Sequence, residues 1–475
     1  MKKRLLLINP WIYDFTAYDL WSKPLGLLYI ASFLRQFDFD IFYIDCLDKY
    51  DRNGQVKPGI NIKKYGTGHY TREVADKPAI LNHIPRRYAR YGITEKEFIA
   101  CLDSLETIDA ILVTSHMTYW YLGVQRVVQL CRKYLPKKPI ILGGIYATLL
   151  PEHARKTINP DYLIRGPGEI QVLELLSSEF NIDYDRSRIP QKLDDYPYPA
   201  FDLINHPDYL IMMTSGGCPY DCLFCAQKLI ARPFEQRAPD HVVEEFRMHY
   251  RTFGIRDFAF YDDALFVNKK THIEPILEHL IASRLPLRLH SPNGLFANAI
   301  DERLADLMYR SHFKTVRLSF ETSDVARQKD MHAKVSNEKM TEAVGHLIGA
   351  GFMARDIEAY VLMGLPDQTL QEIIASVVFI HNLGLQIKVA SFSPIPGTLE
   401  FERAVAKGYI ERDIDPLLTN KTIYPLHHEQ MTMEMFRQIR VLAHILNQAA
   451  LQGLSLFDGK DIGRAVAKVL KQIHE

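Results

Sequence analysis

Three cysteines in one short segment constrain this chain more than any other feature. Cys218, Cys222 and Cys225 lie in TSGGCPYDCLFC (residues 214–225), with three and then two residues between them. The apolar run at 210–213 predicts a buried strand before this loop, and the two glycines allow the backbone to turn sharply and approach a bulky ligand. Three thiolates from one loop can bind three irons of a [4Fe–4S] cube. Because no fourth cysteine lies nearby, one iron would remain open to a small molecule.

Other interpretations fit these cysteines less well. A zinc site needs four protein ligands, or three and a water molecule, and the candidates His241 and His249 lack the local spacing of a zinc knuckle. A disulfide would leave one cysteine over. The remaining cysteines, Cys46, Cys101 and Cys131, stand singly among apolar neighbours, which predicts reduced thiols in the core.

The C-x3-C-x2-C spacing, with Phe224 before the last cysteine, resembles the signature of the radical S-adenosylmethionine (SAM) superfamily. The resemblance implies that SAM chelates the open iron through its amino and carboxylate groups. Reduction, by a donor such as flavodoxin or ferredoxin, then cleaves SAM to a 5′-deoxyadenosyl radical that abstracts hydrogen from a substrate. It also implies that the cysteines are both metal ligands and catalytic, and that Phe224 gives backbone contacts to adenine.

The first part of the chain alternates short apolar runs with helical patterns, which predicts a parallel, doubly wound α/β sheet. Strands are expected at 5–8, 41–44, 110–113, 139–142 and 161–164, and helices at 24–37 and 123–134. Glycines and polar residues gather after these strands, at the edge where such sheets bind ligands. No G-x-G-x-x-G follows the first strand, so a dinucleotide is not expected.

These loops resemble the Rossmann-like cobalamin-binding domain that precedes the radical domain in many radical SAM enzymes. The resemblance implies cobalamin contacts from Asn9, Pro10, Leu25, Gly26, Thr114, Ser115, Gly143, Gly144, Gly166 and Glu169. No D-x-H-x-x-G follows the first strand, so the histidine that ligates cobalt in other cobalamin proteins is absent. The sheet could instead have lost cobalamin and serve as a docking surface. His116 or Trp120 could lie near the corrin's lower face, although Trp120 also fits an ordinary core helix.

Residues 51–100 form a basic insertion in this sheet. Positions 51–90 carry nine Lys or Arg against three Asp or Glu. One interpretation is a lid that supplies cations to an anionic small-molecule substrate or to the corrin's phosphate tail, and the other is a solvated loop. Over the whole chain, Lys+Arg and Asp+Glu both number 57, which argues against a nucleic-acid partner.

After an extended linker at 194–199, strand-like runs recur with room for one helix between them. They cover 210–213, 258–261, 287–290, 315–320, 357–363 and 388–392. Six βα units resemble the partial (βα)6 TIM barrel of radical SAM enzymes. We therefore expect three domains: the cobalamin-binding-like domain at 1–195, the barrel at 196–400, and a helical cap at 401–475 with helices at 400–407, 433–450 and 461–474.

A barrel carries its chemistry at the carboxyl ends of its strands. By resemblance, the SAM contacts there are Phe224, Asp262, Asp263, Asn293, Ser319, Glu321, Gly364 and Pro366. Glu321 corresponds to a glutamate that binds the ribose, and a carboxylate can accept from two vicinal hydroxyls at once. Each acid could instead be a helix cap or a surface group. Arg317 and Arg355 are further candidates for the SAM carboxylate or the substrate.

The leading hypothesis is a cobalamin-dependent radical SAM enzyme that methylates an unactivated carbon. The alternatives are radical rearrangement or cyclisation without methyl transfer, and a cluster-bearing scaffold without turnover; the polar barrel ends argue against the scaffold. The apolar run at 5–8 is too short for a signal peptide, and no stretch approaches the ~20 apolar residues of a membrane helix. A cytoplasmic protein is expected.

Overall fold

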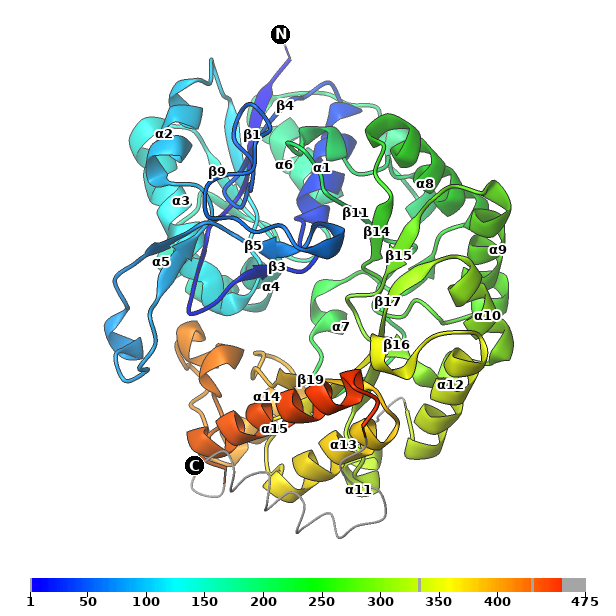
Figure 1. Cartoon of the computed structure of the whole chain (residues 1–475). Coiled ribbons are helices and arrows are strands. Elements are labelled where there is room, and N and C mark those ends of the chain that lie inside the picture. Colours follow the sequence, from blue (N-terminus) through cyan, green and yellow to red (C-terminus); the bar gives the residue numbers. More distant parts are fainter. Residues whose placement is uncertain (1, 332–334, 429–430, 455–475) are drawn as a thin grey trace. The chain divides into compact units, whose positions relative to one another are not determined.

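The computed structural model describes residues 2–331, 335–428 and 431–454 (Figure 1). The chain forms two compact units, divided between Ile211 and Met212. The first, here the N-terminal unit, also includes 227–235 and 415–418, and the rest of the chain forms the barrel unit. Among the described residues, no helix combines the length and apolar character that crossing a bilayer requires.

The N-terminal unit is built on a five-stranded sheet with the order β10-β9-β8-β1-β4. Every neighbouring pair is parallel, which confirms the predicted doubly wound sheet. The strands are β1 (Arg4–Asn9), β4 (Asp40–Asp45), β8 (Ala110–Val113), β9 (Ile140–Leu142) and β10 (Tyr162–Leu163). From β1 the chain passes to β4 on one side, and it then continues through β8, β9 and β10 on the other side. The topological switch point therefore lies between β1 and β8. Open α/β sheets bind ligands at this point.

The central strands of this sheet are apolar on both faces, because helices cover the sheet. The helices are α1 (Leu25–Arg35), α2 (Glu95–Asp103), α3 (Tyr121–Tyr134), α4 (Ile145–Leu149), α5 (Pro151–Ile158), α6 (Glu169–Phe180) and α7 (Gln227–Ile230). Leu5 and Leu7 of β1 are fully buried against Phe33 and Leu34 of α1. This packing fixes the carboxyl ends of the strands, where the predicted ligand contacts lie.

The basic insertion is an ordered antiparallel layer. Its short strands are β5 (Gly68–His69), β6 (Arg72–Val74) and β7 (Ala89–Tyr91), which pair with each other or with β2 (Ile12–Asp14) and β3 (Tyr18–Asp19). Tyr70 and Tyr88 are buried. Two of its cations already have carboxylate partners: Lys57 pairs with Glu97, and Arg90 pairs with Glu73 and Glu95.

The loop after β4 contains an acid with a shifted pKa, which gives a test of stability against pH. Burial raises the pKa of Asp48 to about 6. The folded protein therefore favours the protonated form, and this stabilisation is present below the unfolded pKa and is lost as the pH rises through about 6. We expect Asp48→Asn to raise the free energy of unfolding by about 1–2 kcal/mol at pH 8 and to change it little at pH 4. Urea unfolding at both pH values checks this, with Asp38→Asn, an exposed acid, as the control. An equal effect of Asp48→Asn at both pH values would contradict it.

The barrel unit is an open, six-stranded half barrel whose strands neighbour one another in chain order. They are β11 (Leu210–Met212), β14 (Asp257–Phe260), β15 (Arg288–His290), β17 (Phe313–Glu321), β18 (Ile357–Met363) and β19 (Gln386–Ser391), and the short β16 (Leu295–Phe296) pairs with β17. The pairs from β14 to β19 are parallel. The short strands β12 (Ser215–Gly216) and β13 (Glu235–Gln236) complete the set. All six predicted strands are present.

Helices follow the strands around the outside of the half barrel (Figure 1). They are α8 (Pro239–Phe253), α9 (Ile273–Ser283), α10 (Glu302–Arg310), α11 (Val325–Asp330), α12 (Asn337–Gly349), α13 (Leu370–Asn382), α14 (Leu399–Ala406) and α15 (Met433–Leu451). Two helices of the predicted cap correspond to α14 and α15, and the one expected at 461–474 lies outside the described residues. Phe436, Ile439 and Leu442 of α15 are buried, as their helical spacing predicts.

Candidate active site

The cysteine loop follows β11 at the carboxyl end of the half barrel. Cys218 and Cys222 are half-buried and Cys225 is exposed, and the Cys225 amide donates to the Cys222 carbonyl at 3.0 Å. The ring of Phe224 packs against a buried cluster that includes Leu365, just after β18, and Phe392, just after β19. The loop is therefore held beside the ends of β18 and β19. A cofactor that contacts both the loop and these strand ends would need this arrangement.

The donor set of this loop suits an iron–sulfur cube better than a single ion. None of the six cysteines forms a disulfide. In the part of the chain that the structure describes, no three His, Cys, Asp or Glu side chains converge as ligands of one metal ion, so the structure gives the zinc alternative no support. A cube binds each thiolate at a different iron, so its ligands do not need to converge on one point. Three thiolates from one loop fit a cluster with one open iron.

Asp262 and Asp263 follow β14 and differ in their surroundings. The Asp262 carboxylate is buried and accepts hydrogen bonds from Thr214 and Ser215, at the start of the cysteine loop. Burial raises the pKa of Asp262, and these hydrogen bonds oppose that rise. Asp263 is half-buried and lines a pocket. Both residues were predicted to contact SAM or the substrate, and both line this pocket, although the Asp262 carboxylate is also bound by Thr214 and Ser215.

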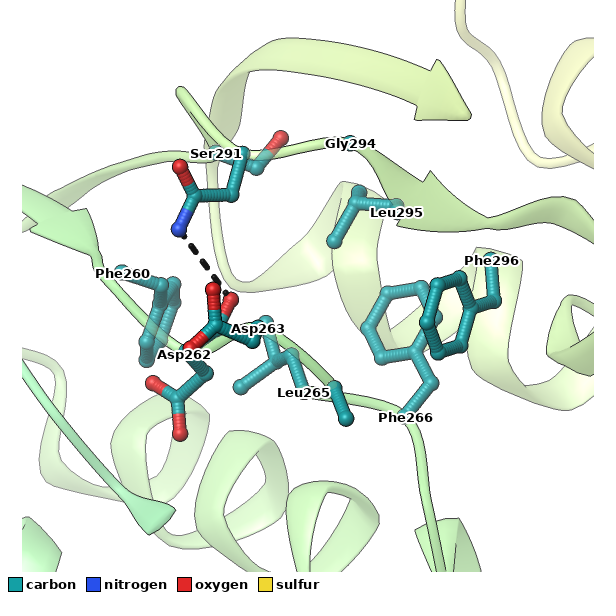
Figure 2. A pocket seen from close by; sticks show the side chains of 11 residues that line it. Phe260, Asp262, Asp263, Leu265, Phe266, Ser291, Gly294, Leu295 and Phe296 are labelled. Carbon is teal, nitrogen blue, oxygen red and sulfur yellow. Dashed lines mark hydrogen bonds between the residues drawn. The ribbon is translucent and has the colours of Figure 1, made fainter. Parts of the chain in front are cut away.

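A small, partly open pocket of about 10 Å³ lies at the ends of β14, β15 and β16 (Figure 2). Asp263, Ser291 and Asn293 give it polar groups, and Phe266 and Phe296 give it an apolar wall. The Asn293 amide donates to the Tyr261 carbonyl at 3.0 Å, which ties the ends of β14 and β15 together. Polar groups beside an aromatic wall are typical of a small-molecule site.

An aromatic contact connects this pocket to the cysteine loop. The ring of Tyr220, between Cys218 and Cys222, meets the ring of Phe296 edge-on with centroids 4.6 Å apart. Phe296 also lines the pocket. A molecule in this pocket would therefore lie next to the loop that carries the three cysteines.

Ser319 and Glu321 stand at the end of β17, where the pairing with β18 shifts between them. Glu321 has a left-handed backbone with φ +66°. A non-glycine residue in this region is strained, and such strain is concentrated at functional sites. Ser319 abuts Gly294, where an added Cβ would lie 2.0 Å from its hydroxyl oxygen. The glycine of the predicted polar turn is thus required for the close approach of β15's end to β17.

The turn after β18 depends on a residue that sequence reasoning missed. Gly364 has φ +92°, and its amide donates to Gln368 Oε1 at 2.8 Å. Gln368 is buried, accepts from the Leu365 amide as well and donates to the Leu362 carbonyl. The sequence offered no signal for this role. In the structure, the side chain of Gln368 holds the Gly364–Pro366 turn closed.

The two candidate arginines do not lie ready for SAM. Arg317 is buried inside the half barrel, where it pairs with Glu358 and donates to the Tyr360 hydroxyl. Glu358 also pairs with Lys388 at 2.8 Å, so Arg317 belongs to an ionic row across three strands. Arg355 precedes β18, at the opposite end from the mouth, and the structure does not support a SAM or substrate contact there.

At the switch point of the N-terminal unit, a short chain of hydrogen bonds crosses from β8 to β4. His116 Nε2 lies 3.0 Å from Asn9 Oδ1, and Asn9 donates through Nδ2 to Asp45 at 2.7 Å. Burial lowers the pKa of His116, which keeps the imidazole neutral near pH 7. Trp120 donates to Asp14 at 2.7 Å and packs against a buried cluster, which favours the core interpretation of Trp120.

The glycines predicted around cobalamin leave space beside the backbone. A Cβ at Gly26 or Gly166 would meet no atom within 4 Å, and one at Gly143 would touch only Ile164, at 3.8 Å or more. Gly144, by contrast, has φ +94°, and an added Cβ there would lie 2.2 Å from the Ser115 carbonyl oxygen. Backbone with room beside it can be approached closely by a large flat ligand, so these residues fit a corrin. Glu169 is held by Arg232 at 3.2 Å.

Comparisons with known proteins agree with this architecture. Residues 212–380 match the model of the radical SAM superfamily. An uncharacterized methyltransferase of Pyrococcus horikoshii is 24% identical over 71% of this chain and 79% of its own length. The cytidylyl-2-hydroxyethylphosphonate methyltransferase of Streptomyces wedmorensis is 22% identical over 86% of this chain and 83% of its own. An anaerobic magnesium-protoporphyrin IX monomethyl ester cyclase of Cereibacter sphaeroides is 24% identical over 54% of this chain and 47% of its own.

Solved structures share the fold. The radical SAM methyltransferase TsrM of Kitasatospora setae aligns with a TM-score of 0.60 at 16% identity, over 86% of this chain and 77% of its own. The cobalamin-dependent SAM radical enzyme OxsB aligns with a TM-score of 0.64 at 11% identity, over the whole of this chain and 75% of its own. A [4Fe–4S] cluster and SAM are the cofactors that the matched domain implies. The chain therefore contains a radical SAM domain, at residues 212–380.

Proposed function

We propose that this enzyme transfers a methyl group to an unactivated carbon of a small molecule, with cobalamin as a second cofactor. The names of two relatives include methyltransferase activity, and solved structures with the same fold hold cobalamin and a cluster. The glycine-lined space at the carboxyl edge of the N-terminal sheet carries the cobalamin part of the proposal. When bound, the cluster supplies the electron that cleaves SAM, and cobalamin supplies the methyl group.

In this proposal, Cys218, Cys222 and Cys225 hold the cluster. Thiolates are its usual protein ligands, and three of them leave one iron for SAM. The loop needs a donor that reaches it, such as flavodoxin or ferredoxin, and the exposure of Cys225 is compatible with electron entry there.

SAM would lie between the cysteine loop and the ends of β17, β18 and β19. Phe224 and Pro366 border the adenine, and the Gly364 turn, closed by Gln368, keeps backbone groups in a fixed position for it. Glu321 accepts from the two ribose hydroxyls, and Ser319 stands beside it. The buried cluster around Phe224, Leu365 and Phe392 supports this placement, because it joins three of the elements involved.

A polar group of the methyl acceptor would enter the small pocket beside Tyr220 (Figure 2). Asp263 and Asn293 can bind its polar groups, while Phe266 and Phe296 contact its apolar part. A radical intermediate requires a site from which water is excluded, and this wall contributes to that exclusion. Two cations of the basic insertion, Lys57 and Arg90, already pair with carboxylates, so the insertion's charge count overstates what it could offer an anionic substrate.

Cobalamin would lie at the switch point of the N-terminal unit. Asn9, Thr114 and Ser115 stand at the ends of β1 and β8, and Ser115 donates to the Gly143 carbonyl at 2.6 Å. The other predicted cobalamin contacts come from segments that follow strands of this sheet in the sequence. They are Pro10, Leu25, Gly26, Gly144, Gly166 and Glu169. If His116 lay near the corrin's lower face, it would present an imidazole whose Nε2 atom is already hydrogen-bonded to Asn9.

The experiment that tests the proposal is product analysis with isotope label. Cobalamin-loaded, cluster-loaded protein receives SAM with a trideuterated methyl group and a reductant. We expect S-adenosylhomocysteine to form in about a one-to-one ratio to corrin, with the label on the corrin, before any acceptor is added. The magnesium-protoporphyrin cyclase among the relatives favours a second candidate, radical cyclisation. 5′-Deoxyadenosine without S-adenosylhomocysteine would contradict methyl transfer and favour that candidate.

The ribose role of Glu321 gives a further prediction. Glu321→Ala should raise the Kd for SAM by about tenfold, since a hydrogen bond to a charged group contributes ~1.5–3 kcal/mol. Equilibrium dialysis of cluster-loaded protein measures the Kd, and Glu411→Ala, an exposed acid of the same unit, serves as the control. An unchanged Kd in Glu321→Ala would remove the ribose role.

A further inference from the structure

We propose that Asp262 helps to position the cysteine loop through its hydrogen bonds to Thr214 and Ser215, and that it is not a SAM ligand. The inference rests on the proposal that Cys218, Cys222 and Cys225 hold the cluster. It assigns to this acid a function in cluster retention.

The Asp262 carboxylate accepts hydrogen bonds from the start of the cysteine loop. Its exposed fraction is 4%. The Thr214 amide donates to both carboxylate oxygens, at 3.0 and 3.1 Å. The Thr214 hydroxyl donates to Oδ1 at 2.8 Å, and the Ser215 hydroxyl donates to the same oxygen at 2.6 Å. A carboxylate that accepts this many bonds in a buried site is committed to its neighbours.

A histidine supports this arrangement from the other side. His272 Nε2 lies 2.9 Å from the Thr214 hydroxyl, and His272 is buried. Because that hydroxyl gives its one proton to Asp262, the imidazole must donate through Nε2. The carboxylate, the threonine and the imidazole thus form one directed chain of hydrogen bonds.

A second buried residue, Arg237, binds carbonyl groups of the same segment. The Arg237 guanidinium donates to the Met213 carbonyl at 2.9 Å, and the Arg237 amide donates to the Thr214 carbonyl at 2.9 Å. Arg237 also pairs with Glu245 at 2.5 Å, and His249 lies 3.2 Å from the other oxygen of that carboxylate. Burial alone would raise the pKa of Glu245, but Arg237 and His249 outweigh it, so Glu245 stays ionised.

Both groups act on residues 213–215, immediately before the two glycines and Cys218. Gly216 belongs to β12, which pairs with β13, and the chain turns at Gly217, which has φ +71°. A flexible turn directs the cysteines reliably only if its first residues are fixed, because ligands must be held near their bound geometry before the ligand arrives. Asp262 and Arg237 provide this fixed start, and Asp262 does so from a strand end 48 residues away.

The test measures iron release, which requires no turnover. Wild type and Asp262→Ala are reconstituted without oxygen, and release of iron to an excess of chelator is followed by absorbance. We expect release from Asp262→Ala to be about tenfold faster or more, because it loses several buried, charge-assisted hydrogen bonds. The reduced cluster should give a broadened electron paramagnetic resonance spectrum, while the Kd for SAM of the loaded fraction stays within about twofold of wild type.

Matched variants separate the alternatives. Asp356→Ala removes an exposed acid of the same unit and should behave as wild type. Ser215→Ala and Thr214→Val remove single donors to Asp262 and should each release iron faster than wild type, though less so than Asp262→Ala. If Asp262→Ala does not fold, these two variants decide the matter, and wild-type release from both overturns the proposal.

Two other results would also overturn it. A tenfold rise in the Kd for SAM with unchanged iron release would make Asp262 a SAM ligand. A wild-type protein that takes up no cluster would refute the assignment of the cysteines, and the positioning role with it. Cluster uptake without methyl transfer would refute only the proposed methylation and leave this inference standing.

Discussion

Replacing Cys222 by alanine is expected to abolish the absorbance of the protein near about 400 nm, where thiolate–iron charge transfer absorbs, together with all SAM cleavage. Cys222 is the middle one of the three ligands, and two thiolates cannot hold three irons of the cube. The measurement is an absorbance spectrum of the anaerobically reconstituted variant, followed by quantification of 5′-deoxyadenosine after reduction.

Cys101→Ala is the matched control for this variant. Cys101 lies in α2 of the N-terminal unit, outside the cysteine loop, and is half-buried. Its replacement should leave the spectrum and the cleavage as in wild type. Retained cleavage in Cys222→Ala would contradict the cluster assignment, because SAM would then have another source of its electron.

The second large effect concerns stability. Lys49 follows β4 in a buried site, with an exposed side-chain fraction of 2%. Its ammonium group pairs with Asp19 at 2.9 Å and Asp208 at 2.8 Å, and it donates to the Gly66 carbonyl at 2.8 Å. Burial lowers the pKa of Lys49, but the two carboxylates outweigh this and raise it. The lysine therefore stays charged and anchors the basic insertion to the sheet.

Lys49→Ala should lower the free energy of unfolding by about 3–5 kcal/mol, because it leaves a fully buried carboxylate without its partner. Urea unfolding followed by circular dichroism measures the change. Lys2→Ala breaks an exposed pair with Asp38 and should cost less than ~1 kcal/mol. If Lys49→Ala lost no more than Lys2→Ala, the anchoring role of the buried pair would be refuted.

Much of the fold could be predicted because local sequence patterns determine it. The strand expected at 357–363 is β18 to the residue, since buried and half-buried positions alternate along it. The cysteine loop is equally local, because its three ligands lie within eight residues of each other. Alternation and spacing of this kind need no knowledge of distant contacts.

The candidate site was less predictable where side chains act across the chain. Two adjacent acids follow β14, and nothing in the sequence distinguishes Asp262 from Asp263. Their difference arises from Thr214, which is 48 residues earlier and binds only Asp262. Gln368 was missed for a similar reason, as its role depends on how the turn before it folds back. The left-handed backbone of Glu321 also follows from a register shift between neighbouring strands, which a single sequence does not reveal.

The basic insertion shows the limit of composition as a guide. Its excess of Lys and Arg suggested either a lid or a solvated loop. In the structure, Tyr70 and Tyr88 are buried, and Lys57 and Arg90 pair with carboxylates that the charge count did not associate with them. Charge totals describe a segment, but they do not say which charges are neutralised by a neighbour.

The most direct test is the quantification of 5′-deoxyadenosine from wild-type protein, reconstituted with iron and sulfide and incubated with SAM and dithionite without oxygen. The account predicts that cluster-loaded protein forms 5′-deoxyadenosine and that protein without the cluster forms none. Protein that binds the full complement of iron and sulfide but leaves SAM intact would contradict it.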